Sequence, residues 1–175
     1  MAPPLSIKGF TSGLALTNAQ IIAVLEWIDL YLERSGADTI YADGDLYRSD
    51  SFTAIVKRAY DRRRERGLPI KVEMYRIDSA DACRDRWAAA GVDVTVHTAA
   101  DVADWTELGV HALKASGATD ALVIGGGKTV LAEFDANELV HFTVFPFKRF
   151  DGKGGVHAAS LLEHPPHPRL TVLPF

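Results

Sequence analysis

The sequence predicts an α/β protein: a single three-layer, Rossmann-like domain over residues 1–175, with a mainly parallel sheet of six or seven strands. Three observations predict it. Short apolar segments alternate with longer amphipathic ones along the chain, and strands separated by helices form βαβ units with parallel pairing. Glycine closes most of the helical segments, as is common at helix C-termini. The 175 residues suffice for one domain and are few for two.

The N-terminal half contains two strand–helix units. The first strand breaks at the turn Thr11-Ser12-Gly13, and Thr17 or Asn18 caps a helix whose apolar side chains recur every three or four residues. The second strand runs into Asp43-Gly44-Asp45, and Gly67 ends the helix that follows it. The expected elements are a strand at 5–10, a helix from 17 or 18 to about 34, a strand at 38–42 and a helix at 51–66.

The same unit repeats in the C-terminal half. Gly91 and Gly117 close two helices, and an apolar strand that ends at Ile124 runs into three glycines. The expected elements are strand 70–77, helix 78–90, strand 92–97, helix 104–116, strand 121–124, helix 128–135 and strand 139–145. Beyond them, the pattern predicts a glycine-rich loop at 151–155, a helical turn at 156–162 and a last edge strand at 170–173.

Composition and charge exclude several classes of protein. The net charge is −4, whereas proteins that coat nucleic acids are strongly basic, so no nucleic-acid partner is expected. Cys83 is the single cysteine, which excludes an internal disulfide and fits a reducing cytoplasm. No apolar stretch approaches the roughly 20 residues that span a bilayer, and the N-terminus lacks the pattern of a signal peptide. We therefore expect a cytoplasmic protein without a membrane partner.

Ligands of an open parallel sheet bind outside the carboxyl ends of its strands, where the loops lead into helix N-termini. The residues that the expected strands bring to this edge are therefore the candidate binding residues. They are Thr11, Ser12, Gly13, Asp43, Arg76, Gly125, Gly126, Gly127, Lys128, Thr129, Lys148, Arg149, Gly154 and Gly155.

The sharpest signal among them is ALVIGGGKT at residues 121–129. Glycine lets the backbone turn sharply and lets an anion approach the amides, and the start of the next helix favours negative charge. Lys128 and Thr129 add a cation and a hydroxyl at this position. The loop is not a Walker A motif, because Leu122 stands where the first glycine of that motif belongs. The sequence predicts a phosphate-binding loop, with a ligand-free tight turn as the alternative.

Three carboxylates are the candidates for chemistry. Asp43 and Asp45 follow the second strand, where acidic side chains commonly contact ribose hydroxyls; they are also suited to hold a metal, to act as a base, or to form only a charged turn. Glu133 lies one turn into the helix after the glycines, as a general base or as a surface residue of the helix. The histidines have no zinc-binding spacing, so no zinc site is expected.

With these residues in view, the chain resembles the SLOG superfamily, the Rossmann-like group of Lonely-guy hydrolases, Smf proteins and nucleotide-sensing domains of effector proteins. Three segments carry the resemblance: GFTSG at 9–13, TDALVIGGGKTVLAEF at 119–134 and FTVFPFKRFDGKGGVHAA at 142–159. The resemblance implies a nucleotide ligand at the carboxyl edge of the sheet. It also implies a role for Glu133, or for Asp45, at the anomeric carbon if the protein is a hydrolase.

The departures from this pattern fall on the hydrolase motif. Lonely-guy enzymes carry P-G-G-x-G-T-x-x-E, whereas here no proline precedes the glycines, Lys128 occupies a glycine position and Glu133 comes one residue later. The glycine-containing C-terminal segment is more similar to the sensing branch, which the resemblance associates with ligands of the ADP-ribose type.

Four functions therefore stay open at the level of sequence. The first is binding of a phosphate-bearing nucleotide or nucleotide-derived signal, and the second is N-glycosidase action on a nucleoside monophosphate. The third is an NADPH reductase of the dihydrofolate-reductase type, since VIGGG before a helix also resembles that family. The fourth is a purely structural domain. Two forms of the protein are compatible with these functions: a homo-oligomer and a domain of a larger effector.

Overall fold

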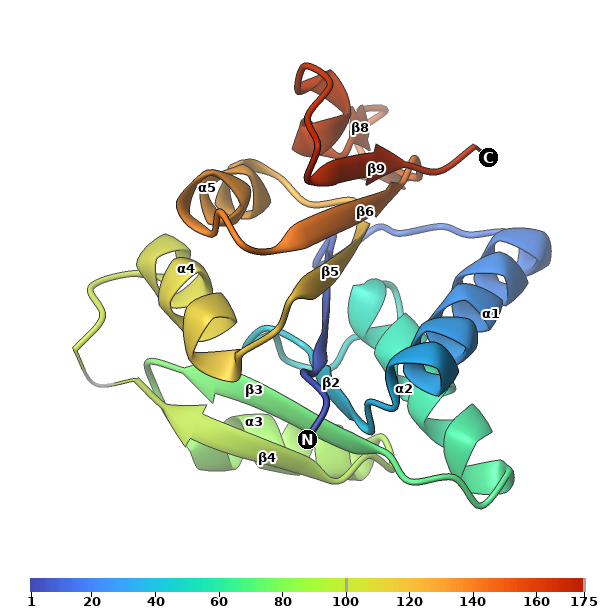
Figure 1. Cartoon of the computed structure of the whole chain (residues 1–175), viewed down its shortest axis with the longest axis vertical. Helices are drawn as coiled ribbons and strands as arrows, with labels where there is room; N and C mark the ends of the chain where they lie inside the picture. The colour runs from blue at the N-terminus through green and yellow to red at the C-terminus, as the bar shows by residue number, and fades with distance from the viewer. Residues whose placement is uncertain (100, 175) are drawn as a thin grey trace.

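The computed structural model describes residues 1–99 and 101–174, and it confirms an α/β fold with a parallel sheet. The strands of the main sheet are β1 (Leu5–Gly9), β2 (Thr39–Tyr41), β3 (Lys71–Arg76), β4 (Val94–Thr98), β5 (Asp120–Ile124), β6 (His141–Phe145) and β9 (Leu170–Val172). They lie in the order β4-β3-β2-β1-β5-β6-β9, and each pair of neighbours is parallel (Figure 1).

Helices cover both faces of this sheet. They are α1 (Asn18–Ser35), α2 (Phe52–Glu65), α3 (Ala80–Ala89), α4 (Trp105–Ser116) and α5 (Lys128–Ala136). One apolar core contains side chains of α1, α2 and α3, and a second contains side chains of α4 and α5. Figure 1 shows α1 and α2 on one side of the sheet and α4 and α5 on the other. This is the three-layer arrangement that right-handed βαβ crossovers produce when the chain winds in both directions from a central strand.

The strand order reverses at β1. The chain first moves outward through β2, β3 and β4, then returns to the other side of β1 to form β5 and β6. Gly9 and Ile124 are consequently partners at the carboxyl ends of β1 and β5. The loops after two such strands leave toward opposite faces and open a crevice between them, which is the usual ligand site of open α/β sheets.

Local signals in the sequence explain where the helices begin and end. Thr17 accepts a hydrogen bond from the Gln20 amide, while the Gln20 side chain accepts one from the Thr17 amide, so the predicted cap of α1 is a full capping box. Gly36 and Gly117 end α1 and α4 in the left-handed conformation, at φ 73° and 72°.

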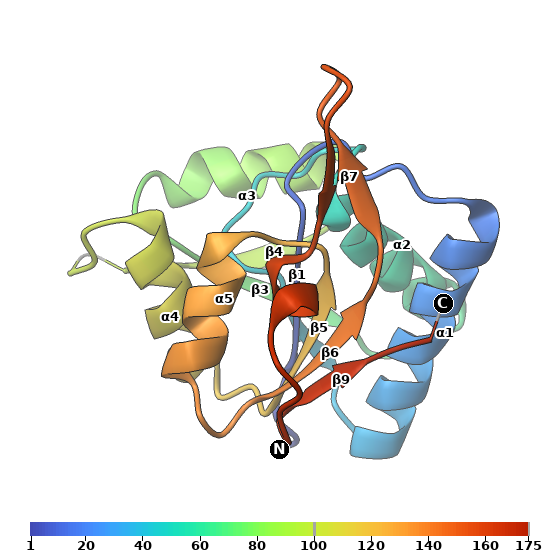
Figure 2. The same ribbon diagram turned by 90° about the horizontal axis from the view of Figure 1, so that it is seen from above.

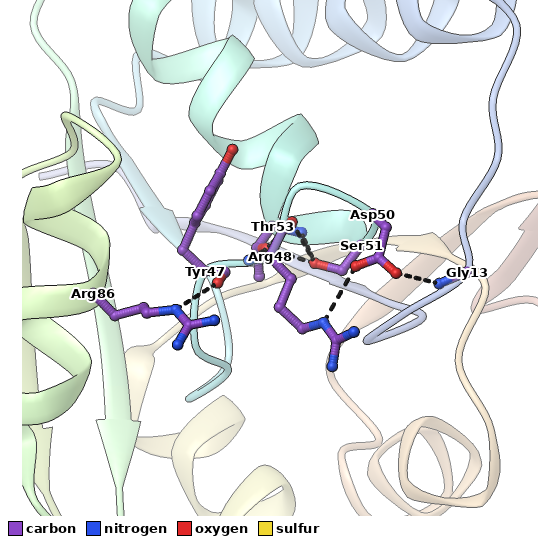
Figure 3. A network of polar contacts seen from close by, with 7 residues as sticks. All are labelled: Gly13, Tyr47, Arg48, Asp50, Ser51, Thr53 and Arg86. Atoms are coloured by element: carbon purple, nitrogen blue, oxygen red, sulfur yellow. Dashed lines mark hydrogen bonds and ion pairs between the residues drawn. The ribbon is translucent and has the colours of Figure 1, made fainter.

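A polar network holds the loop between β2 and α2 against its neighbours (Figure 3). Asp50 accepts a hydrogen bond from the Gly13 amide at 3.2 Å, and Ser51 caps α2 by accepting one from Thr53. Arg86 of α3 donates to the Tyr47 carbonyl at 3.3 Å. The loops after β1 and β2, which frame the crevice, are thereby fixed to each other and to α3.

The segment at 156–162 differs from the predicted helical turn. Its first part is β8 (Val156–Ala158), which pairs antiparallel with β7 (Lys148–Phe150) in a hairpin that projects from the body (Figure 2). Only the second part is helical, as the 3₁₀ turn η1 (Ser160–Glu163). The hairpin forms because Asp151 accepts hydrogen bonds from the amides of Lys153 and Gly155 and closes the turn between its strands.

Candidate functional site

A cavity of about 490 Å³ lies at the carboxyl ends of β1, β2 and β5. Its wall is built from the loops after β1 and β2, one side of α4, the first turns of α5, and the hairpin of β7 and β8. This volume falls within the roughly 300–1,000 Å³ that is typical of small-molecule sites, and its position is the crevice that the strand order creates.

The floor of the cavity is an ion cluster around a buried lysine. Lys8 of β1 has no exposed side-chain surface, and its Nζ lies 2.5 Å from Asp43 Oδ1 and 2.7 Å from Glu133 Oε2. The same Nζ lies 5.2 Å from the centre of the Tyr41 ring. Because side chains alternate along a strand, Lys8 points away from its neighbour Ile7 and toward the face that α4 and α5 cover.

The charges of this cluster are unequal, since one cation faces several carboxylates. Burial by itself lowers the pKa of Lys8, but Asp43 and Glu133 raise it to about 12, so the ammonium stays charged. Burial raises the pKa of Glu133 above its usual range; Lys8 opposes this shift and Asp43 adds to it. Burial also raises the pKa of Asp45 to about 7, again with a contribution from Asp43. Two carboxyl groups in one cavity therefore exchange protons near neutral pH, which suits acid–base chemistry.

The turn after β2 presents two of these carboxylates. Asp43 has a φ of 44°, a left-handed conformation that is uncommon outside glycine. Gly44 packs so closely on the Tyr75 carbonyl that a Cβ would overlap it. Trp87 of α3 donates to the Asp45 carbonyl at 2.9 Å. Contacts with β3 and with α3 thus hold the turn in place, and its two carboxylates face the cavity in fixed positions.

The Glu133 carboxylate occupies space that a glycine of the neighbouring helix leaves open. Gly109 lies within α4, buried, and a Cβ at this position would overlap Glu133 Oε1. Because Gly109 has no side chain, α4 approaches α5 closely enough to cover Glu133, of which 1% is exposed.

The glycine loop forms another wall. Gly125 and Gly126 have φ of 98° and 91°, and a Cβ at Gly125 would overlap the ring of Phe10. Gly127 is the N-cap of α5 and no side chain caps this helix, so the first amides of α5 have no partner from a capping residue. Lys128 is exposed.

The sequence predicts part of this wall. The predicted site residues that line the cavity are Thr11, Asp43, Asp45, Gly126, Gly127, Thr129, Glu133 and Arg149. The predicted residues that lie outside its wall are Ser12, Gly13, Arg76, Gly125, Lys128, Lys148, Gly154 and Gly155. Two of these make other contacts: the Gly13 amide donates to Asp50, and Arg76 pairs with Asp78 and donates to the Gly44 carbonyl.

Several residues of the site had not been predicted. Lys8 lies beneath the wall and binds two of the carboxylates, while Tyr41, Trp105, Gly109 and His157 line the cavity. A signal existed for Lys8: a charged residue in the middle of a strand expected to be buried requires a buried partner. Trp105 and His157 carried no such signal, because helix α4 and the hairpin reach the cavity only through the tertiary fold.

Two further findings concern metal sites and membrane-spanning helices. Among the described residues, no group of three or more histidine, cysteine or acidic side chains is arranged to hold a metal ion. Within the same ranges, no helix has the length and apolar character that crossing a membrane requires.

Comparison with known proteins gives no match: no family model, no curated protein and no solved structure matches this chain. The resemblance to the SLOG superfamily therefore stays a prediction, and the cavity is the feature from which a function can be inferred.

Gly109→Ala tests the close contact between Gly109 and the Glu133 carboxylate. In an ordinary helix this change stabilises by about 1 kcal/mol. Here the added methyl meets the Glu133 carboxylate, and overpacking typically costs about 1–3 kcal/mol. We expect net destabilisation, measured as the free energy of unfolding in urea. In a Glu133→Ala background the same change should be neutral or stabilising, and an equal loss in both backgrounds would contradict the assignment.

Asp45→Asn tests the buried carboxyl. The folded protein keeps the Asp45 proton up to about pH 7, because burial raises its pKa, while the unfolded chain releases it near pH 3.8. Wild-type stability therefore falls as the pH rises between these values. The variant has no such loss, so its melting temperature should rise relative to that of the wild type between about pH 4 and about pH 7, and the difference should be constant above that range. The exposed Asp85→Asn is the control, and a difference that does not change with pH would refute the idea.

Proposed function

We propose that this protein binds a nucleotide or a nucleotide-derived molecule of the ADP-ribose type in the cavity at the carboxyl ends of β1, β2 and β5. One observation carries the proposal: the uncapped start of α5 and the carboxylates after β2 face the same cavity at the point where the strand order reverses. A nucleotide has an anionic end and a hydroxyl-rich sugar, which match these two walls.

Each part of such a ligand has a suitable counterpart. The backbone amides at the start of α5 are suited to a phosphate, because no side chain caps this helix and they lie at the positive end of the helix dipole. Asp43 and Asp45 are suited to accept hydrogen bonds from ribose hydroxyls.

Trp105 is suited to the base. It is 46% exposed although it lines the cavity, and the Arg76 guanidinium lies 4.8 Å from the centre of its ring. Arg76 is held in turn by Asp78. An indole fixed in this way and exposed to the cavity offers a stacking surface for a planar base.

Trp105→Ala tests the binding of a nucleotide. A ligand with a Kd near 1 μM, supplied at about 100 μM, should stabilise the wild type by about 2.7 kcal/mol, a shift in Tm of about 5 to 10 °C. Loss of one base–indole stack is worth about 1–3 kcal/mol, so the variant should bind about 5- to 150-fold more weakly by calorimetry.

The ligands for this test are AMP, CMP, NAD and ADP-ribose. The matched control is Trp27→Ala, which removes the same side chain from α1, where Trp27 stacks on Tyr31 outside the cavity. If none of the ligands shifts the melting temperature, or if both tryptophan variants bind alike, the proposal fails.

A second candidate function is hydrolysis of the N-glycosidic bond of a nucleoside monophosphate. It is favoured by the burial of Glu133 and by the raised pKa values of Glu133 and Asp45. In this reaction water attacks C1′ as the bond from C1′ to the base nitrogen breaks. The departing base keeps the electron pair and receives a proton, while one carboxylate takes a proton from the water.

Glu133→Gln separates binding from hydrolysis. The change keeps the shape of the side chain and removes its charge. In a hydrolase, base released from AMP or CMP should fall at least about 100-fold while Kd changes little, because a positioned acid or base is worth about that much. The exposed Glu138→Gln is the control, and released base is measured by chromatography. Undiminished release by Glu133→Gln would exclude Glu133 as the acting carboxylate.

A further inference from the structure

The hairpin of β7 and β8 brings two nitrogen-rich side chains to the cavity. Arg149 and His157 are direct partners across the hairpin, and both line the cavity. Directly opposed residues of an antiparallel pair project from the same face, so the guanidinium and the imidazole lie side by side. An isolated bridge between Leu14 and Arg149 attaches β7 to the segment after β1.

Arg149 lacks the acceptors that a guanidinium requires. Its Nε is buried and has no hydrogen-bond partner. No carboxylate of residues 1–99 and 101–174 forms a salt bridge with it. The guanidinium lies over the Phe10 ring, with Cζ 5.7 Å from the ring centre. Because a buried donor without an acceptor costs free energy, a ligand oxygen here would supply what the chain does not.

His157 is held in place by a rigid carboxylate. Its Nε2 lies 3.1 Å from Asp151 Oδ2. The amides of Lys153 and Gly155 fix Asp151, and they and His157 lower its pKa to about 2, so it is ionised at neutral pH. Asp151 thus orients the imidazole by accepting a hydrogen bond from Nε2, and Nδ1 is the ring atom that remains to meet a ligand. Nδ1 donates to a phosphate oxygen in the imidazolium form of the ring.

The hairpin is attached to the glycine loop on the opposite wall. The Ser160 amide, just after β8, donates to the Gly126 carbonyl at 3.0 Å. Ser160 also lines the cavity, as does Thr129 on the other side. The groups around this part of the cavity are therefore mostly donors, in contrast to the carboxylates on its floor. Donors that include a guanidinium suit an anion with several oxygens arranged around one centre, which is the chemistry of phosphate.

We propose that Arg149 and His157 form a phosphate-binding subsite on the hairpin side of the cavity, facing the start of α5. The assignment deepens the proposed function by placing the phosphate end of the ligand, and it rests on that function only for the nucleoside part. The subsite itself takes a phosphoryl group from any source, including pyrophosphate.

Calorimetric titration of AMP, adenosine and inorganic pyrophosphate into the full chain tests this subsite. Arg149→Met should weaken AMP and pyrophosphate binding about 10- to 100-fold, the worth of a hydrogen bond to a charged group, and leave adenosine binding unchanged. His157→Gln should weaken the same two ligands to a smaller degree. Lys153→Met removes a cation from the tip of the same hairpin and should change neither affinity.

The outcomes separate the two proposals. If pyrophosphate binds the wild type, loses affinity in Arg149→Met, and neither adenosine nor AMP binds better than pyrophosphate, the subsite stands and the nucleotide proposal falls. If AMP and adenosine bind equally, or if Arg149→Met affects both alike, the subsite is refuted. Arg149→Lys serves if the methionine variant is misfolded by circular dichroism; it keeps the charge without the planar fork, and affinity for AMP equal to that of the wild type would also refute the subsite.

Discussion

The ammonium of Lys8 is the interaction on which the rest of the site depends. It lies in the central strand and binds one carboxylate from the loop after β2 and another from α5, three segments that are far apart in sequence. A buried ion is tolerated only when it is paired, and removing one partner of such a pair typically costs about 3–5 kcal/mol. The cluster therefore fixes the position of α5 relative to β1, and the ammonium opposes the rise that burial causes in the pKa of Glu133 and of Asp45.

This dependence gives the cavity two unlike ends. Near the floor, Asp43, Asp45 and Glu133 share one cation, and at the hairpin Arg149 and His157 present nitrogen atoms. A ligand with charge of one sign throughout would meet repulsion at one of these ends. The arrangement favours a molecule whose anionic group and hydroxyl groups are separated by the length of the cavity, and it provides selection by orientation as well as by charge.

The sequence predicts what is encoded locally. The apolar periods, the Thr17 cap and the glycines after helices identify the strands and helices, and the strand order then places the loop at Gly126 at the site. Side-chain direction is not local. Lys128 has the expected charge in the expected loop but is exposed, whereas Lys8, inside a strand, pairs with two carboxylates that line the cavity. The strand at 156–158 was missed because it forms through pairing with 148–150, across a turn that Asp151 closes.

Gly109 in α4 belongs to a set of residues whose identities depend on one another across the sequence. Gly109 is required because of a side chain 24 residues later, and Lys8 is required because of partners in two other elements. A lysine in the first strand, Asp-Gly-Asp after the second, a glycine inside the fourth helix and a glutamate in the fifth therefore form a spaced signature. Its members would be retained or lost together in any lineage that inherited this cavity, so distant kin should be recognisable by it even after the surrounding sequence has diverged.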